Sequence, residues 1–468
     1  MKADQRFFPE TYDFPDDEIS IPDDFRQGRI EGENTVRCPY PHEIPVELSF
    51  GKDPFTSCID GCHQLSFLCP KCGESNRILA RFCRGCSQRI SFENIQEDVN
   101  KHLVIDASTT DLHAIHSINL SDRGAERVTA TFSFKGYLIV GTKGAGLVVY
   151  NAFEPNTAIH HFDDFHSETV LDIREVKDQE GSPPTVLVTT DMSVYLLYMM
   201  PQFQLKQLYK VNHDGAIQYA VLHLPKNLFV FQTSAGNRPI KFIQKDIESF
   251  KEVRILENEL EFSDTMIARP IEMKDRKFFL YTQEKCWIYD PVKKTVVKSR
   301  ALEFPLDPCN IPVFHPRRDE IYIPGPNAIY RCKLSEDRLI PLPLGQCTFH
   351  DFRFSISPDG ESLYIAHGKC FSIVDAISGH TKWDAYSQLF IGNPSGFFPP
   401  LKAGEYVIFV SRSRFGHCNV TFFSTASHDM IPFGKYHDIP QQPAIILNRL
   451  FVPTSERGKI ELKVFEIK

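Results

Sequence analysis

One structural unit recurs through most of this chain and constrains its fold more than any other feature. The unit is an apolar strand, a short turn and a second apolar strand, as in GYLIVGTKGAGLVVY from residue 136 and SLYIAHGKCFSIVD from residue 362. Eight copies begin at residues 136, 185, 227, 277, 320, 362, 406 and 449, so neighbouring copies start 42 to 50 residues apart. Because no long amphipathic helix pattern interrupts them, these runs predict a mainly β protein.

The period of the repeat predicts a closed β-propeller. A repeat of about 40 to 45 residues is typical of a four-stranded propeller blade. Eight blades would account for every copy; the alternatives are seven blades with one irregular insertion, or a linear array or two sandwiches. The last copy ends at Lys468 with no room for a fourth strand, whereas an apolar segment at 112–120 precedes the first copy without a hairpin of its own. We therefore expect this segment to complete the C-terminal blade, which closes the ring and removes exposed sheet edges.

Cysteines are concentrated near the N-terminus, where seven of the thirteen lie within the first 86 residues. Residues 67–90 contain two C-x2-C pairs ten residues apart, which comprise Cys69, Cys72, Cys83 and Cys86. Two such turns can supply four sulfurs in the tetrahedral arrangement that zinc prefers, and metal binding would then provide the folding free energy of so small a segment. The alternative is a redox pair or unrelated thiols, but no thioredoxin-like pattern surrounds either pair.

The sequences CPKCG and ARFCRGC resemble the short bacterial-type zinc ribbon, whose usual pattern has a glycine after the fourth cysteine; here that residue is Ser87. The resemblance implies one structural zinc held by these four cysteines, and a departure at Ser87 that affects the turn rather than the ligands. A second candidate zinc site of mixed ligation lies upstream, in two halves separated by 15 residues. It comprises Cys38, His42, Cys58 and Cys62. Its alternative is a set of cysteines beside the ribbon that bind no metal.

The sixth copy of the repeat ends in IVDAISGHTKWDA, residues 373–385. This segment resembles the quinoprotein-type (PQQ-like) propeller repeat. The residues that carry the resemblance are Asp375, Ala376, Ser378, Gly379 and Trp383. The resemblance implies that Asp375 and Gly379 make a tight reversal and that Trp383 fills the space between neighbouring blades. Because the match is confined to one copy, it implies a scaffold and no particular chemistry.

Charge divides the chain into unlike regions. Residues 1–50 contain 12 acidic and 5 basic side chains, whereas residues 58–90 have five basic and two acidic ones. We expect an acidic, proline-rich flexible segment at 1–57, the zinc ribbon at 58–92 and the propeller at 93–468. The near-repeats DFPDD and IPDDF, with Phe14, Ile21 and Phe25, have the form of a motif that docks in a partner's groove. A solvated tail, or one that packs along its own body, is the alternative.

Motifs that would indicate catalysis are absent from the sequence. It has no phosphate-binding glycine loop, no G-x-S-x-G and no H-E-x-x-H, and HHFDDFH at 160–166 predicts an outer strand and turn more readily than a metal site at His160, Asp164 and His166. With neither a secretory signal nor a membrane-spanning stretch, we expect a cytoplasmic, non-enzymatic scaffold or adaptor that binds other proteins. The alternatives are a nucleic-acid-associated factor that uses the basic ribbon, and a divergent enzyme with its site in the propeller funnel.

Overall fold

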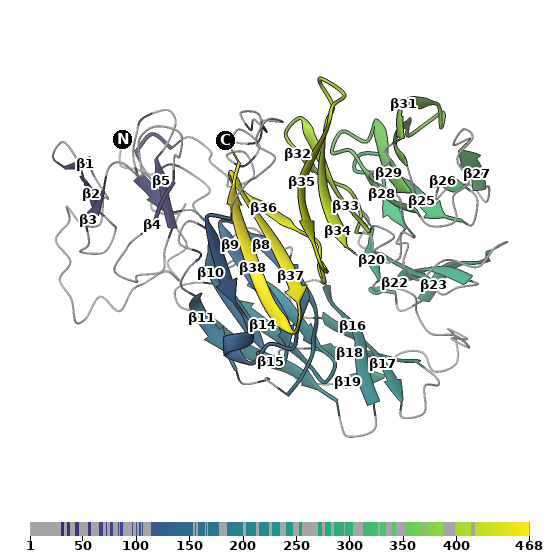
Figure 1. Ribbon diagram of the computed structural model, residues 1–468. Helices are drawn as coiled ribbons and strands as arrows, with labels where there is room; N and C mark the ends of the chain where they lie inside the picture. The colour runs from purple at the N-terminus through teal and green to yellow at the C-terminus, as the bar shows by residue number, and fades with distance from the viewer. Residues whose placement is uncertain are drawn as a thin grey trace.

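The computed structural model describes residues 114–467 with gaps, the longest of which are 255–269 and 387–397, and describes short strands and single positions before residue 114. Within this part of the chain, eight four-stranded antiparallel sheets follow one another along the sequence (Figure 1). We number these sheets as blades in chain order, and the two central strands of each blade coincide with one of the eight predicted hairpins. The predictions of a mainly β fold and of a β-propeller are confirmed.

The first four blades have the following strands. Blade 1 comprises β8 (Arg127–Phe134), β9 (Tyr137–Lys143), β10 (Leu147–Asn151) and β11 (Ala158–Phe162). Blade 2 comprises β12 (Val170–Glu175), β13 (Thr185–Thr190), β14 (Ser193–Tyr198) and β15 (Gln204–Lys210). Blade 3 comprises β16 (Gly215–His223), β17 (Asn227–Ser234), β18 (Ile240–Asp246) and β19 (Glu252–Arg254). Blade 4 comprises β20 (Ile271–Glu272), β21 (Phe278–Tyr281), β22 (Lys285–Asp290) and β23 (Thr295–Ala301).

The last four blades repeat the same order. Blade 5 comprises β24 (Val313–Phe314), β25 (Glu320–Pro324), β26 (Ile329–Lys333) and β27 (Leu339–Leu342). Blade 6 comprises β28 (Phe352–Ile356), β29 (Ser362–His367), β30 (Cys370–Asp375) and β31 (Thr381–Tyr386). Blade 7 comprises β32 (Leu401–Ala403), β33 (Tyr406–Arg412), β34 (Cys418–Ser424) and β35 (Met430–Tyr436). Blade 8 comprises β36 (Ala444–Ile446), β37 (Arg449–Glu456), β38 (Lys459–Glu466) and β7 (His116–Asn119).

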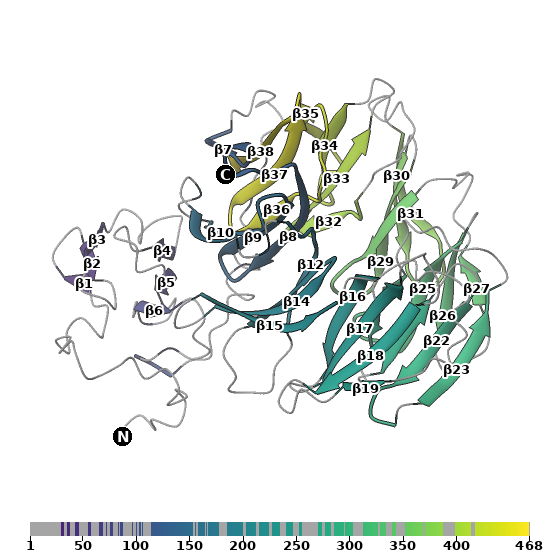
Figure 2. The same ribbon diagram turned by 90° about the horizontal axis from the view of Figure 1, so that it is seen from below.

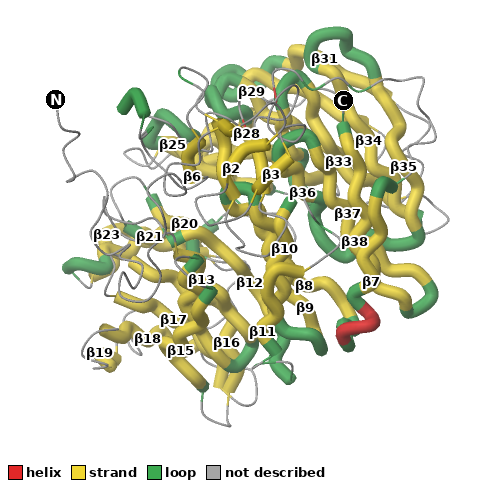
Figure 3. Tube along the Cα trace, turned by 90° about the vertical axis from the view of Figure 1, so that its left-hand side faces the viewer, coloured by secondary structure: helices red, strands yellow, loops and turns green. Residues whose placement is uncertain are grey.

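Blade 8 joins the two ends of the propeller. Strand β7, which precedes blade 1 in the sequence, pairs antiparallel with β38, and Ile118 lies opposite Leu462 (Figure 3). Both side chains are buried, and a single 3-10 turn, η4 (Ser121–Arg123), leads from β7 toward β8. The prediction that the segment at 112–120 completes the C-terminal blade is therefore confirmed.

The core lies between the blades rather than at one centre. In β10, Val148, Val149 and Tyr150 are consecutive and all 0% exposed, because a central strand packs against neighbouring blades on both of its faces. The outer strand β23 shows another pattern, because exposed and half-buried residues alternate along it. Continuous apolar runs in the sequence therefore mark the central strands.

The blades are arranged around a ring (Figure 2), and buried clusters connect each blade to the next. Aromatic pairs illustrate three of these junctions, with ring centroids 5.1 Å apart for Phe229 and Phe278, 4.8 Å for Phe371 and Phe409, and 5.0 Å for Phe433 and Phe465. The cluster that contains Leu138 of blade 1 also includes Leu462 of blade 8 and Val188 of blade 2. Packing and strand pairing thus close the same ring.

Short strands precede the propeller. One three-stranded sheet contains β1 (Ile30–Glu31), β2 (Thr35–Arg37) and β3 (Glu43–Pro45), and another contains β4 (Phe55–Ser57), β5 (Leu65–Leu68) and β6 (Ser75–Arg77). Residues just before β7 pack on the ring, since Leu103 and Ile105 are buried in the cluster between blades 7 and 8, and the Ile105 N–H donates to the Tyr406 hydroxyl at 3.1 Å.

No helix in the described part of the chain is long and apolar enough to cross a membrane.

Candidate metal centre

Three of the four cysteines predicted to bind zinc come together in the structure. The sulfur atoms of Cys72, Cys83 and Cys86 all lie within 4.8 Å of one another, and those of Cys72 and Cys83 are 3.5 Å apart. Tetrahedral coordination with zinc–sulfur bonds of ~2.3 Å separates ligand sulfurs by about 3.8 Å. The three thiols are therefore close enough to hold one metal ion.

The local fold explains how the first C-x2-C pair reaches this point. Strands β5 and β6 form an antiparallel hairpin in which Leu68 lies opposite Ser75, and Cys72 occupies the turn that joins them. Cys69 directly follows β5 in the sequence but lies outside the described residues. The hairpin thus presents Cys72 at its tip, where the spacing of the motif predicts a ligand.

The second C-x2-C pair forms a tight turn around one sulfur. The Gly85 backbone N–H donates to the Cys83 Sγ at 3.3 Å, and the Ser87 N–H donates to the Cys83 carbonyl oxygen at 2.7 Å. A backbone N–H directed at sulfur favours the thiolate, which is the form that binds metal. Ser87 has φ of 57°, the left-handed conformation in which glycine is favoured. Ser87, which departs from the ribbon pattern, therefore has a backbone conformation that glycine would adopt with less strain.

The cluster of three cysteines packs against the propeller through its most buried thiol. Cys83 is only 1% exposed and belongs to the same packed cluster as core residues of blades 8, 1 and 2, and Cys86 packs against that cluster. Cys72 is exposed. One side of the centre therefore faces the ring and the other faces solvent.

Other residues singled out as ligand candidates lie mostly outside the described residues. These are Cys38, His42, Cys58 and Cys62 of the second candidate site, and Asp164 and His166 of the HHFDDFH segment. His160 lies on β11, the outer strand of blade 1, where its ring is 4.2 Å from that of Phe162 and 5.9 Å from that of Phe203. The prediction of an outer strand at this segment is confirmed.

The turn that resembles the quinoprotein repeat has the predicted geometry. Oδ1 of Asp375 accepts the backbone N–H groups of Ile377 at 3.0 Å and Ser378 at 2.8 Å, and Gly379 has φ of 72°. Partial burial would by itself raise the pKa of Asp375, but the hydrogen bonds from Ser378 and Ile377 outweigh burial and lower the pKa to about 2. Trp383 contacts Phe423 of blade 7 at 4.2 Å between ring centroids, so it does fill the space between blades.

Two further turns of this kind were missed by the sequence analysis. Asp290 at the end of β22 accepts the N–H groups of Val292 and Lys293, both at 3.0 Å. At the end of β34, the His428 N–H donates to the Ser424 carbonyl at 2.9 Å, and His428 has φ of 64°, as Gly379 does in the matching turn. The position itself, the last residue of the third strand of a blade, is the pattern that could have revealed them.

The strand order and the turn geometry define a β-propeller, and solved structures that include a propeller are similar to this chain. The computationally designed Ika8 protein matches with a TM-score of 0.51 at 11% identity over 75% of this chain and 99% of that one. The Dos1 propeller matches with a TM-score of 0.51 at 11% identity over 77% and 97%, and Saccharomyces cerevisiae Sqt1 with 0.54 at 10% over 76% and 99%. At these identities the likeness concerns the fold alone. The sequence matches no protein-family profile and no curated protein.

Proposed function

We propose that the protein is a cytoplasmic, non-catalytic scaffold that binds other proteins, with one structural zinc that fixes a ribbon to the rim of the propeller. The observation that carries the proposal is the burial of Cys83 in the packed cluster of blades 8, 1 and 2. Because a ligand of the metal is part of the ring's own core, the ribbon would hold one position on the propeller. The proposed organisation is an acidic segment at 1–57, the ribbon at 58–92 and the propeller at 93–468.

A closed propeller suits such a role for a physical reason. Every blade shares a buried apolar cluster with its neighbours, so the ring can present loops and outer strands without a change in its backbone. A rigid surface loses little conformational entropy when a partner binds, and this leaves more of the contact free energy for affinity. The thiolate centre also favours a reducing compartment, because oxidation of its cysteines would destroy the ligand set.

The proposed ligands of the zinc are Cys69, Cys72, Cys83 and Cys86. Metal analysis of the purified full-length chain should give one zinc per chain, and Cys83→Ser should remove most of it. Cys418→Ser is a matched control, because Cys418 is also buried but lies on β34 in blade 7. A Cys83→Ser variant that keeps its full zinc content would contradict the assignment. A second equivalent of zinc would instead direct attention to Cys38, His42, Cys58 and Cys62.

The scaffold itself is tested by recovery of partners from the native cell. After cross-linking in living cells, the tagged full-length chain should co-purify with the same proteins in near-equal amounts in repeated experiments. Treatment with nucleases should leave these proteins bound, because the contacts are proposed to be between proteins. Recovery of the chain alone would contradict the scaffold, and loss of all partners after nuclease treatment would favour the nucleic-acid-associated alternative.

A further inference from the structure

The rim of the propeller has a hollow lined by residues of blades 4 and 5. It contains about 390 Å³ of empty space, part of which is open to solvent, and its lining is mostly apolar. Phe279, Ile288 and Leu339 contribute apolar surface from both blades, and the two cationic residues of the lining are Lys298 and Arg300. We call this hollow the blade 4–5 groove.

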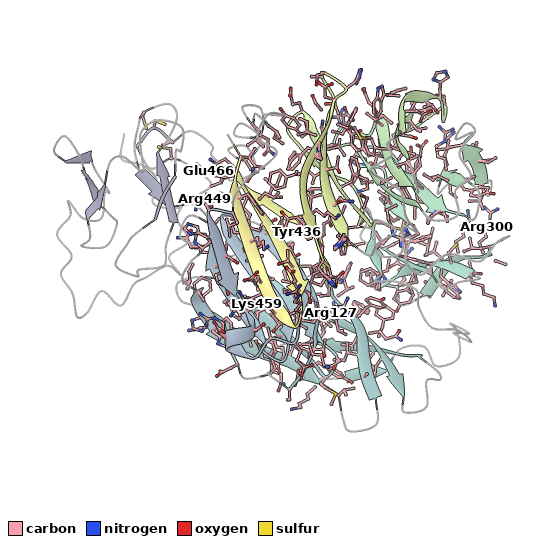
Figure 4. All side chains as sticks on the ribbon, in the orientation of Figure 1. Arg127, Arg300, Tyr436, Arg449, Lys459 and Glu466 are labelled. Carbon is pink, nitrogen blue, oxygen red and sulfur yellow. The ribbon has the colours of Figure 1, made fainter. Side chains whose placement is uncertain are left out.

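The position of the two cations follows from the strand register. Lys298 and Arg300 alternate with exposed residues along β23, so their side chains share one face, and they lie opposite Ile288 and Cys286 of β22. The pKa of Cys286 is consistent with this arrangement, since burial and, to a smaller extent, the nearby Cys332 raise it to about 12 although Arg300 and Lys298 act to lower it. Figure 4 shows Arg300 at the outer edge of the molecule. Positive charge is therefore placed at the mouth of an apolar groove.

The strand that carries these cations is also the outer edge of its sheet. In the described structure β23 has β22 on one side only. It is seven residues long, contains no proline, and exposes 53% of Val297, while the preceding turn exposes 72% of Val292. Two other outer strands are blunted by proline, Pro341 in β27 and Pro432 in β35. A long edge with apolar side chains and no proline is suited to pairing with another strand.

We propose that β23 and the blade 4–5 groove bind an extended, acidic segment of a partner protein by strand addition. A segment paired with β23 would place every second side chain on the face of Lys298 and Arg300. An apolar side chain at such a position would fill the groove, and flanking carboxylates would lie beside the two cations. Side chains on the opposite face would contact Val297. The partner's recognition sequence is therefore an apolar residue with a carboxylate two positions before it and another two positions after it.

This inference rests on the proposed scaffold function and names the kind of segment that the scaffold binds. The chain has an acidic segment of its own at residues 1–57, but blades 4 and 5 lie across the ring from blades 8 and 1, where Cys83 packs. A segment that precedes the ribbon would have to cross the ring to reach the groove. A partner protein that approaches the rim from solvent has no such span to bridge.

Selection of peptides provides the test. A phage library of extended peptides, roughly ten residues long, would be selected on the full-length chain and counter-selected on the variant with Lys298→Glu and Arg300→Glu. The recovered peptides should share an apolar residue with carboxylates two positions before and after it, and synthetic copies should bind the variant at least about 10-fold more weakly. Their affinity for the natural chain should also fall as salt rises, because the charges are at the surface. The matched control is Lys206→Glu with Lys210→Glu on β15, another exposed outer strand, which should bind as the natural chain does.

Each other outcome overturns the proposal in a distinct way. Failure to recover any peptide, or peptides that bind the groove variant and the natural chain equally, would remove the groove as a peptide site. A gain of about 10-fold in peptide affinity when Asp16, Asp17, Asp23 and Asp24 are all changed to Asn would assign the groove to the chain's own acidic segment. If the natural chain self-associates and the groove variant does not, the groove would be assigned to a second copy of the chain. If partners still co-purify with the groove variant, the scaffold stands and only this site is wrong.

Discussion

Closure of the propeller by β7 should stabilise the whole ring and not only the blade that it completes. The change Ile118→Ala tests this, because Ile118 is 8% exposed and packs in the cluster that joins blades 8, 1 and 2. The substitution removes three buried carbon atoms, at about 0.8 kcal/mol each, and leaves a cavity, so we expect a loss of about 3 kcal/mol in the free energy of unfolding. The control is Ile115→Ala, which alters a side chain that is 42% exposed and should cost about 1 kcal/mol or less.

The natural tryptophans make the assay informative. The chain has only two, Trp287 in blade 4 and Trp383 in blade 6, so neither lies in blade 8. If the ring unfolds cooperatively, tryptophan fluorescence should report a urea midpoint lower by about 1 M for Ile118→Ala, taking a slope of about 3 kcal/mol per molar. The reasoning is refuted if that midpoint is unchanged while hydrogen exchange at β38 becomes faster, since blade 8 would then open independently.

Three further substitutions test local features. Ser87→Gly should relieve the left-handed backbone at φ of 57° and tighten zinc binding about fivefold in competition with a chelator; weaker binding would argue against the strain. Gly360→Ala should lower the free energy of unfolding by about 3 kcal/mol or more, because the added Cβ would lie 2.3 Å from the His315 ring. The control is Gly458→Ala, which has a similar φ and nothing within 4 Å, and should lower it by only about 1 kcal/mol. Equal unfolding midpoints for the two variants would disprove the clash. Asp375 has its pKa lowered from 3.8 to about 2, so its charged form should stabilise the fold above pH 4 by about 1 kcal/mol relative to Asp375→Asn, and acid titration of the two proteins should show this difference vanish as pH falls through about 2.

Central hairpins could be predicted from sequence because burial on both faces leaves long apolar runs, such as those of β9 and β10. Other strands gave no such pattern. β20 and β24 have two residues each, which is too short to show any period. The closing strand was found by a different route, since a missing fourth strand at one end and an unpaired one at the other imply each other. Local spacing and strand completion were therefore the reliable guides.

The candidate sites divide in the same way. The grouping of Cys72, Cys83 and Cys86 followed from spacing, because the ligands of a ribbon are fixed by two short turns. The blade 4–5 groove could not be predicted from residue spacing. Lys298 and Leu339 come from different blades and meet only because one sheet packs on the next. The register of β22 with β23 shifts between Ile288 and Tyr289, and this register determines which side chains of β23 face the groove. Neither the packing of the two blades nor the register shift can be predicted from the sequence.

The pairing of β7 with β38 sets an order of events during synthesis. Ile118 leaves the ribosome about 340 residues before its partner Leu462, which at roughly 5–20 residues per second is a delay of tens of seconds. Through that interval the growing chain has seven complete sheets to form but no ring, and the apolar side of β7 has no native partner. The chain is therefore exposed to aggregation and to chaperones until β38 has emerged, and a ribosome stalled before that strand would leave the ring open at one seam.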